Sequence, residues 1–186
     1  MYIFWLVCAY TLIVLVMVLS HMFMTDYLNN YDKDVGKKMK YWHRVIQRCA
    51  ASGNYRMKKK ELRKFHNSRH LTAFFGLRCE KEKETGLLLD CNAQELIKVV
   101  RKNRYETEKA YFAYMLGKFP DSYDVLLMKY ADFMLECLTR DSVYLRENAL
   151  EVLYKIGEPQ TIGEAFRILS EHGIYHNDKL LADGLM

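Results

Sequence analysis

The first 24 residues contain no Lys, Arg, Asp or Glu, and this run constrains the fold more than any other feature of the sequence. A membrane-spanning helix needs about 20 mainly apolar residues, and 24 helical residues rise about 36 Å, enough to cross a hydrocarbon core of about 30 Å. Tyr10 and Tyr27 lie toward opposite ends of the run, where aromatic belts form. The sequence therefore predicts a transmembrane anchor over residues 1–25. The predicted anchor residues are Trp5, Leu6, Leu12, Leu15 and Leu19.

Two other interpretations of this run are a cleaved signal peptide and a buried helix of a globular domain. A signal peptide usually has a positively charged start, a shorter apolar core and small residues at its cleavage site. Here no Lys or Arg precedes the run, and Ser20-His21-Met22 is a poor cleavage site. We therefore expect an uncleaved anchor.

Charged residues divide the rest of the chain into a basic and an acidic part. Residues 33–83 hold sixteen Lys and Arg against four Asp and Glu, whereas residues 84–186 are mildly acidic. Lys and Arg favour the cytoplasmic flank of a membrane helix, so we expect a single-pass protein of the cell membrane with a cytoplasmic C-terminal body. The five cysteines contain no C-x-x-C pair, which indicates reduced thiols, with Cys79 and Cys137 expected in the core.

Residues 26–57 are predicted to form a basic juxtamembrane helix that ends near Ala50–Asn54. Its apolar stripe has helical spacing. The stripe consists of Tyr31, Val35, Met39, Trp42, Ile46 and Cys49. In one interpretation the helix lies on the inner leaflet and its basic residues bind anionic lipid head groups. The predicted head-group residues are Lys37, Lys38, Lys40 and Arg44. In the other, the stripe packs on the body or on a partner helix.

Other ligands for the polar residues find little support in the sequence. Nucleic-acid binding usually adds base-stacking aromatic residues or a reading motif to a basic cluster, so no nucleic acid is expected. The histidine pairs His66/His70 and His172/His176 have helical spacing, but a metal site needs further ligands, and none is expected. The common phosphate-binding, dinucleotide-binding and nucleophile motifs do not occur in the sequence. We predict no catalytic residue, cofactor or metal.

Residues 58–186 are predicted to be stacked antiparallel helix pairs, because helical segments recur with a period of about 39 residues. A helix pair of this size cannot bury its apolar face alone, so the pairs must stack. One second helix is expected over Val125–Leu138, capped by Asp121-Ser122. Residues 177–186 look like the start of another first helix, so the last repeat is expected to be incomplete. The shift of 39 superimposes Tyr105 on Tyr144, Glu108 on Glu147, Ala110 on Ala149 and Pro120 on Pro159.

The clearest repeat, residues 141–171, resembles a HEAT repeat, which has an acidic turn, an Arg, an Ala-Leu pair and then Ile-Gly. The matching residues are Asp141, Arg146, Ala149, Leu150, Ile156 and Gly157. The copy upstream has Thr107 at the position of the Arg. The resemblance implies an all-α solenoid whose helices line a protein-binding surface, and it does not imply an enzyme. Tyrosine is common at interfaces. The predicted protein-binding residues are therefore Tyr105, Tyr144 and Arg146.

Together these features predict a membrane-anchored cytosolic HEAT-like scaffold that binds a protein partner at the lipid bilayer. Tethering raises the partner's effective concentration, so a weak interface suffices. An alternative is an accessory subunit of a membrane enzyme or transporter, for example a glycosyltransferase, in which the spanning helix itself makes the contacts. A HEAT-like enzyme is a third hypothesis without candidate residues. Homo-oligomerisation stays open.

Overall fold

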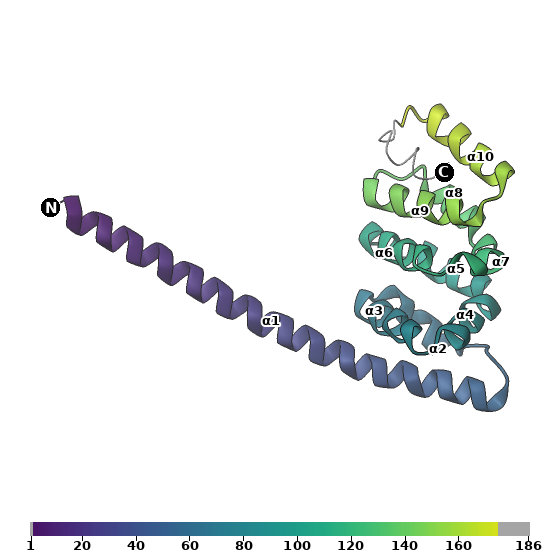
Figure 1. Cartoon of the computed structure of the whole chain (residues 1–186), viewed down its shortest axis with the longest axis horizontal. Coiled ribbons are helices and arrows are strands. Elements are labelled where there is room, and N and C mark those ends of the chain that lie inside the picture. The colour runs from purple at the N-terminus through teal and green to yellow at the C-terminus, as the bar shows by residue number, and fades with distance from the viewer. Residues whose placement is uncertain (1, 175–186) are drawn as a thin grey trace.

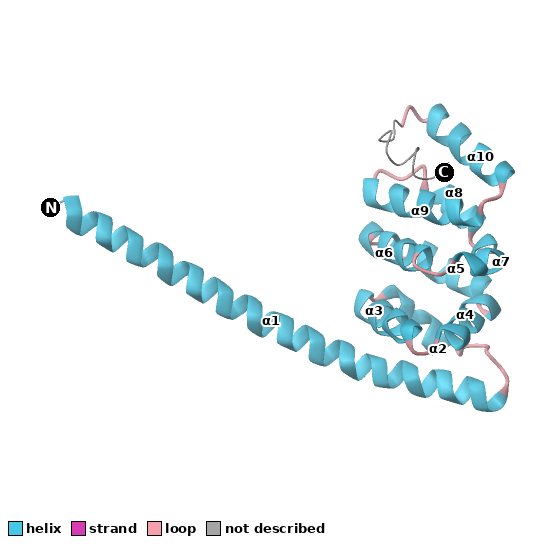
Figure 2. Cartoon of the chain, in the orientation of Figure 1, coloured by secondary structure: helices cyan, strands magenta, loops and turns pink. Residues whose placement is uncertain are grey.

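The structure, a computed structural model, describes residues 2–174, and all regular elements in that range are helical, as predicted (Figures 1 and 2). The predicted helix start at 177–186 lies outside the described residues. The α-helices are α1 (Tyr2–Ser52), α2 (Lys59–Leu62), α3 (Ser68–Gly76), α4 (Glu82–Cys91), α5 (Ala93–Arg101), α6 (Glu106–Gly117), α7 (Asp124–Met128), α8 (Ala131–Cys137), α9 (Val143–Ile156) and α10 (Pro159–Glu171). The 3₁₀ helices are η1 (Arg63–His66), η2 (Leu77–Cys79) and η3 (Asp121–Tyr123).

Helix α1 runs without interruption from the predicted anchor (1–25) into the predicted juxtamembrane segment (26–57) and ends there at Ser52. Its 51 residues correspond to a length of about 76 Å. Neither Pro nor a pair of Gly residues occurs in α1, so nothing in the sequence forces a joint between the two segments. The helix ends as expected, since Gly53 follows it with a φ of 65° that favours glycine. In Figure 1 its N-terminal half projects away from the other helices.

The C-terminal half of α1 packs on the body, which confirms the second interpretation of the apolar stripe. Trp42 is 0% exposed, and Ile46 and Cys49 are also buried. The Trp42 ring lies 5.2 Å from the ring of Phe65 and 5.1 Å from that of Phe74, both edge-on. The folded body therefore begins inside α1 rather than at residue 58.

Four helices that follow one another in the stack run in the same direction: the C-terminal half of α1, then α3, α6 and α9. Most polar contacts between successive layers of the stack join residues 33 to 41 positions apart, whereas Trp42 and His70 are 28 apart. Examples are Asp34 with Arg69, Ser68 with Glu108, Asn148 with the Ala110 carbonyl and Lys155 with the Phe119 carbonyl. Figure 1 shows the resulting layers, with α3, α6 and α9 one above another. The spacing agrees with the period of about 39 found in the sequence.

The helix predicted over Val125–Leu138 is instead divided into α7 and α8, so that prediction is wrong. The break falls at Tyr130, whose side chain is fully buried and whose hydroxyl donates to the Leu89 carbonyl at 2.9 Å. A matching break separates α4 from α5 at Asn92, a buried side chain that donates to the Tyr55 carbonyl and accepts from the Met57 amide. Tertiary contacts of these two polar side chains override the helical pattern.

The cysteines are all free within the described structure. Cys137 is buried as expected, and burial raises the pKa of its thiol to about 12. Cys79 is exposed at the end of η2, so its predicted place in the core is wrong. Cys91 is exposed as well, whereas Cys49 lies in the core.

Candidate membrane and partner interfaces

The N-terminal half of α1 presents an apolar surface that no other part of the described protein covers. The five predicted anchor residues, Trp5, Leu6, Leu12, Leu15 and Leu19, are 44–69% exposed. Thr11 and Thr25 donate their hydroxyl protons to carbonyls one turn back, so these polar groups are satisfied within the helix. Within residues 2–174, α1 is the one helix long and apolar enough to span a membrane.

A basic stripe runs along the outer face of α1, opposite the buried stripe. Lys33, Lys37, Lys40 and Arg44 recur at spacings of four, three and four, and all four are exposed. Lys38 differs from them, because it is half-buried and forms an ion pair with Asp34. Lys38 is thereby part of the junction between α1 and α3, which argues against its predicted head-group role.

Asp34 also binds Arg69 of α3, with 2.9 Å between its carboxylate and the guanidinium. Hydrogen bonds from Lys38 and from Arg69 hold the pKa of Asp34 below its usual value. The aspartate therefore stays ionised and links α1 to α3 near the point where α1 leaves the body.

The length of α1 limits which basic residues reach lipid head groups. With the apolar run ending at residue 25, Lys40 and Arg44 lie about 22 and 28 Å further along the helix axis. The head-group layer is only about 5–8 Å thick, and a tilt of about 40° still leaves Arg44 about 20 Å away. If α1 spans a bilayer as a straight helix, Lys33 and Lys37 lie nearest to the head groups, and Lys40 and Arg44 lie beyond them. The head-group role of Lys40 and Arg44 stays a prediction, which this geometry does not favour.

An open groove with a volume of about 470 Å³ lies beside the basic stripe. Met39 and Leu77 give it an apolar lining, and Lys40, His43 and Arg44 add basic groups. A smaller depression of about 280 Å³ lies across Arg44 and includes Arg48 of α1 together with Lys58 and Lys60. The two depressions suit a ligand that combines acidic groups with an apolar side chain.

Buried polar contacts fix α1 to the body close to these depressions. Arg48 donates to both carboxylate oxygens of Glu61, at 2.7 and 3.1 Å, and Glu61 is only 2% exposed. Burial alone would raise the pKa of Glu61, but hydrogen bonds from Arg48 and from the Lys58 amide bring it below its usual value. The charge of Glu61 thus neutralises that of Arg48, and the charges of Lys58 and Lys60 beside them have no acidic partner among the described residues.

His70 of α3 lies against α1 next to Tyr41 and Trp42. Its carbonyl accepts a hydrogen bond of 3.1 Å from the Trp42 indole nitrogen. Burial, together with the nearby Lys64 and Lys38, lowers the pKa of the imidazole to about 4, so the ring is neutral at pH 7. Within residues 2–174 no group of three potential metal ligands occurs. His176 lies outside the described residues.

The three predicted protein-binding residues lie at the N-terminal ends of neighbouring helices. Tyr105 and Tyr144 are 62% and 75% exposed, at the starts of α6 and α9. Arg146 instead donates to the carbonyls of Arg140 and Asp141, at 2.6 and 2.9 Å. These bonds hold the loop before α9 in place, so the Arg146 guanidinium is used within the chain. Its role in binding a partner stays a prediction.

Several residues that border the groove or the loop before α6 could not be singled out from the sequence, and one of them, Leu77, is itself largely buried. Leu77 and His43 border the groove, but they lie 34 positions apart and no short motif joins them. Lys102 and Arg104 precede α6 beside Tyr105, and both are exposed. The repeat period was the one signal that could have found them, because it fixes which loops share an end of the stack.

Comparisons with known proteins give no relative: no family model, no curated protein and no solved structure matches this chain. Function is therefore argued from the arrangement of the chain's own residues.

Proposed function

We propose that this chain is a single-pass membrane protein whose helical body is a scaffold for an acidic protein partner on the cytosolic side. The observation that carries the proposal is the continuity of α1, which passes from an exposed apolar segment directly into the core around Trp42. Transferring the apolar segment into lipid removes that surface from water. The body is then held at the bilayer by a stiff helix instead of a flexible linker.

In this proposal the body is a HEAT-like α-solenoid, with the C-terminal half of α1 as its first helix. The parallel course of α1, α3, α6 and α9 supports this assignment, as do the polar contacts between layers at separations of 33 to 41 residues. Stacked repeats of this kind give extended surfaces on which partners bind.

The partner surface in this proposal is the groove beside α1. Apolar contact with Met39 and Leu77 would supply affinity, and Lys40 and Arg44 would select acidic groups. The position of the groove some 20 Å from the bilayer favours a protein segment over lipid as its occupant.

The native cysteines test the anchor and its orientation without engineering. Cys8 lies in the apolar segment, and Cys79 and Cys91 are exposed on the body. In cells, a membrane-impermeant maleimide should label Cys79 and Cys91 only after the plasma membrane is permeabilised, and Cys8 only after detergent is added. Labelling of Cys79 in intact cells would show the opposite orientation. Release of the chain by alkaline carbonate, with Cys8 reactive, would exclude the anchor.

A photoreactive amino acid at His43 tests the partner surface in living cells. We expect one discrete protein adduct, and we expect Lys40→Glu combined with Arg44→Glu to abolish it while the chain remains carbonate-resistant. The matched control places the same amino acid at Gln160, an exposed position on α10, where no such adduct should form. An adduct that survives charge reversal, or no adduct at His43, would count against this partner surface.

A further inference from the structure

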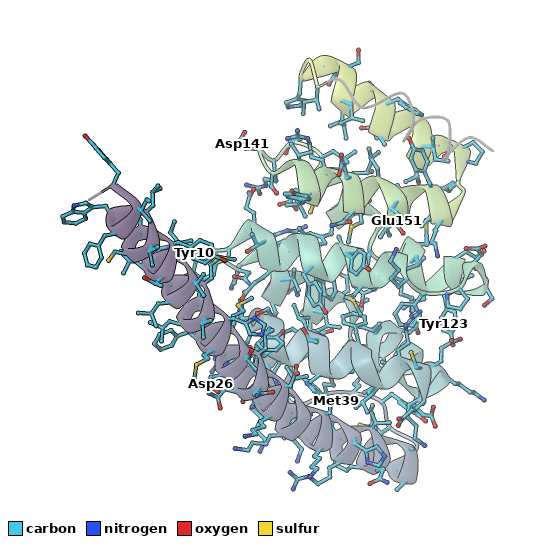
Figure 3. The ribbon with its side chains drawn as sticks, turned by 60° about the vertical axis from the view of Figure 1, so that its left-hand side comes forward. Tyr10, Asp26, Met39, Tyr123, Asp141 and Glu151 are labelled. Atoms are coloured by element: carbon cyan, nitrogen blue, oxygen red, sulfur yellow. The ribbon has the colours of Figure 1, made fainter. Side chains whose placement is uncertain are left out.

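The loops that precede α6 and α9 face the same way as the anchor. Asp34 of α1 binds Arg69 near the start of α3, and a Cβ atom at Gly76, the last residue of α3, would lie 3.6 Å from Cε of Met39, so the two helices run parallel. The contacts between α3 and α6 and between α6 and α9 follow the same order. Figure 3 shows Asp141, at the start of α9, on the side of the body toward which α1 extends to Asp26 and Tyr10.

The register of these contacts gives the height of the loops along α1. Each layer is displaced from the next by 33 to 41 positions. Averaged layer by layer, these offsets place Tyr105 and Tyr144 level with about residues 29–33 of α1, and the individual contacts spread this level over about residues 24–39. The turn of α1 at 29–33 lies about 6–12 Å beyond residue 25, where the apolar run ends. The lipid head groups extend about 5–8 Å from the edge of the hydrocarbon core, so the near side of this turn falls within them.

The loops before α6 and α9, residues 102–105 and 140–144, are called the rim, and their side chains suit a membrane interface. Tyr105, Val143 and Tyr144 are exposed, Val143 by 51%. Lys102 and Arg104 are also exposed, and neither has an ion-pair partner within residues 2–174. Tyrosine is enriched at the level of head groups, and Lys and Arg are attracted to anionic lipid. The exposed acidic residue on the rim is Asp141, which opposes this attraction.

Neighbouring cations on the rim are already engaged and add little. Arg101 and Arg140 both bind Glu136, so their charges are partly balanced. The free charge therefore belongs to Lys102 and Arg104, directly beside Tyr105.

We propose that the loops at 102–105 and 140–144 form a second membrane contact, which rests on the surface of anionic phospholipid head groups. The inference depends on the proposed function, because it requires α1 to span the bilayer. Membrane helices are tilted by about 20° on average, and a tilt of α1 toward the side that carries the body lowers this rim onto the lipid. The contact would fix the direction of the tilt and leave the groove beside α1 free.

The test uses the full chain in phosphatidylcholine vesicles with and without phosphatidylserine, and with a spin-labelled head-group lipid as quencher. Cys8, Cys79 and Cys91 are replaced by Ser, and a fluorophore is attached through Val143→Cys. The matched control carries the fluorophore through Gln160→Cys, at the start of α10, which follows the C-terminal end of α9. We expect quenching at position 143, stronger with phosphatidylserine, and little at position 160.

Replacement of the two free cations gives the quantitative arm of the experiment. Each charge near an anionic surface changes the docked-to-undocked ratio about fivefold, so Lys102→Ser with Arg104→Ser should lower it about 25-fold and relieve the quenching. Vesicle flotation separates the two proposals. A chain that does not float with vesicles contradicts the anchor, whereas a floating chain with equal quenching at 143 and 160 contradicts the rim contact alone. Protection of position 143 only in native membranes would identify the rim as a protein interface and overturn the lipid contact.

Discussion

At the scale of single residues, Trp42 joins the anchor helix to the body. It is completely buried, its indole donates to the His70 carbonyl, and its ring contacts Phe65 and Phe74. Two ion pairs join the same helix to its neighbours, Arg48 with Glu61 and Asp34 with Arg69, and they fix the orientation of α1 on the body. The connection between the exposed apolar segment of α1 and the body thus depends on a few side chains of one helix face.

Trp42→Ala should therefore destabilise the body strongly. Truncating a buried Trp costs about 3–5 kcal/mol, through lost burial and the cavity that remains. The free energy of unfolding of the full chain in detergent, measured with chemical denaturant, gives the comparison. Gln47→Ala, on the exposed face of the same helix, is the control and should change stability little. Equal effects of the two substitutions would contradict the packing described for α1.

His70 makes this junction sensitive to acid. Its pKa is about 4 in the folded protein and about 6.5 in an unfolded chain, so the unfolded state binds more protons between these values. Stability should therefore fall as the pH is lowered from about 6.5 toward 4. Thermal unfolding of the full chain at pH 7 and pH 5 should show this decrease, and His70→Phe should reduce it. The same decrease in both proteins would assign it to other groups, since Asp34 and Glu61 lose their stabilising charge only at lower pH.

At the scale of elements, glycines within helices differ sharply in their surroundings. A Cβ atom at Gly36 of α1 would meet nothing within 4 Å, whereas at Gly86 of α4 it would lie 2.5 Å from Cε1 of Tyr123. Gly36 therefore only lowers the helix propensity of α1. Gly86 instead permits close contact between α4 and η3.

The pair Gly36→Ala and Gly86→Ala should change stability in opposite directions. Alanine at residue 36 should add about 0.5–1 kcal/mol, because it lowers the flexibility of the unfolded chain. Alanine at residue 86 should cost about 1–3 kcal/mol, since the Tyr123 ring must move. Thermal unfolding of the two variants in the same detergent checks the prediction. Loss of stability in the first variant would indicate that α1 bends at Gly36.

The helices and the apolar stripe of α1 could be predicted because both depend on local spacing. The end of α1 was predicted from the helix-breaking residues around Gly53. The stripe with Trp42 and Ile46 was predicted as well, but whether it packs on lipid or on protein stayed open until the structure showed both residues buried. The break at Tyr130 could not be predicted, because it depends on a hydrogen bond to the Leu89 carbonyl, 41 positions away. Tyr105 and Tyr144 could be selected from the repeat pattern, but their level along α1 required the register of the stack.

At the scale of the whole molecule, the proposed anchor and the first helix of the body are parts of one helix, α1. An insertion of Gly-Ser-Gly-Ser between Asp32 and Lys33 would separate them while leaving both sequences intact. We expect the variant to stay in the membrane and to lose quenching at position 143, because the rim is then no longer held at a fixed height. Retained quenching would mean that the rim binds lipid without help from the helix.

Because α1 is unbroken, rotation of its apolar segment about the helix axis also rotates the body. One extra leucine after Val14 turns the upstream part of the anchor by about 100° relative to everything downstream. Lipid surrounds the helix uniformly, so contacts with lipid do not depend on this rotation, and a simple anchor would tolerate the inserted leucine. A neighbouring protein that binds one face of the apolar segment would keep that contact only if the whole stack rotated about the axis of α1. The groove would then face a different direction around that axis.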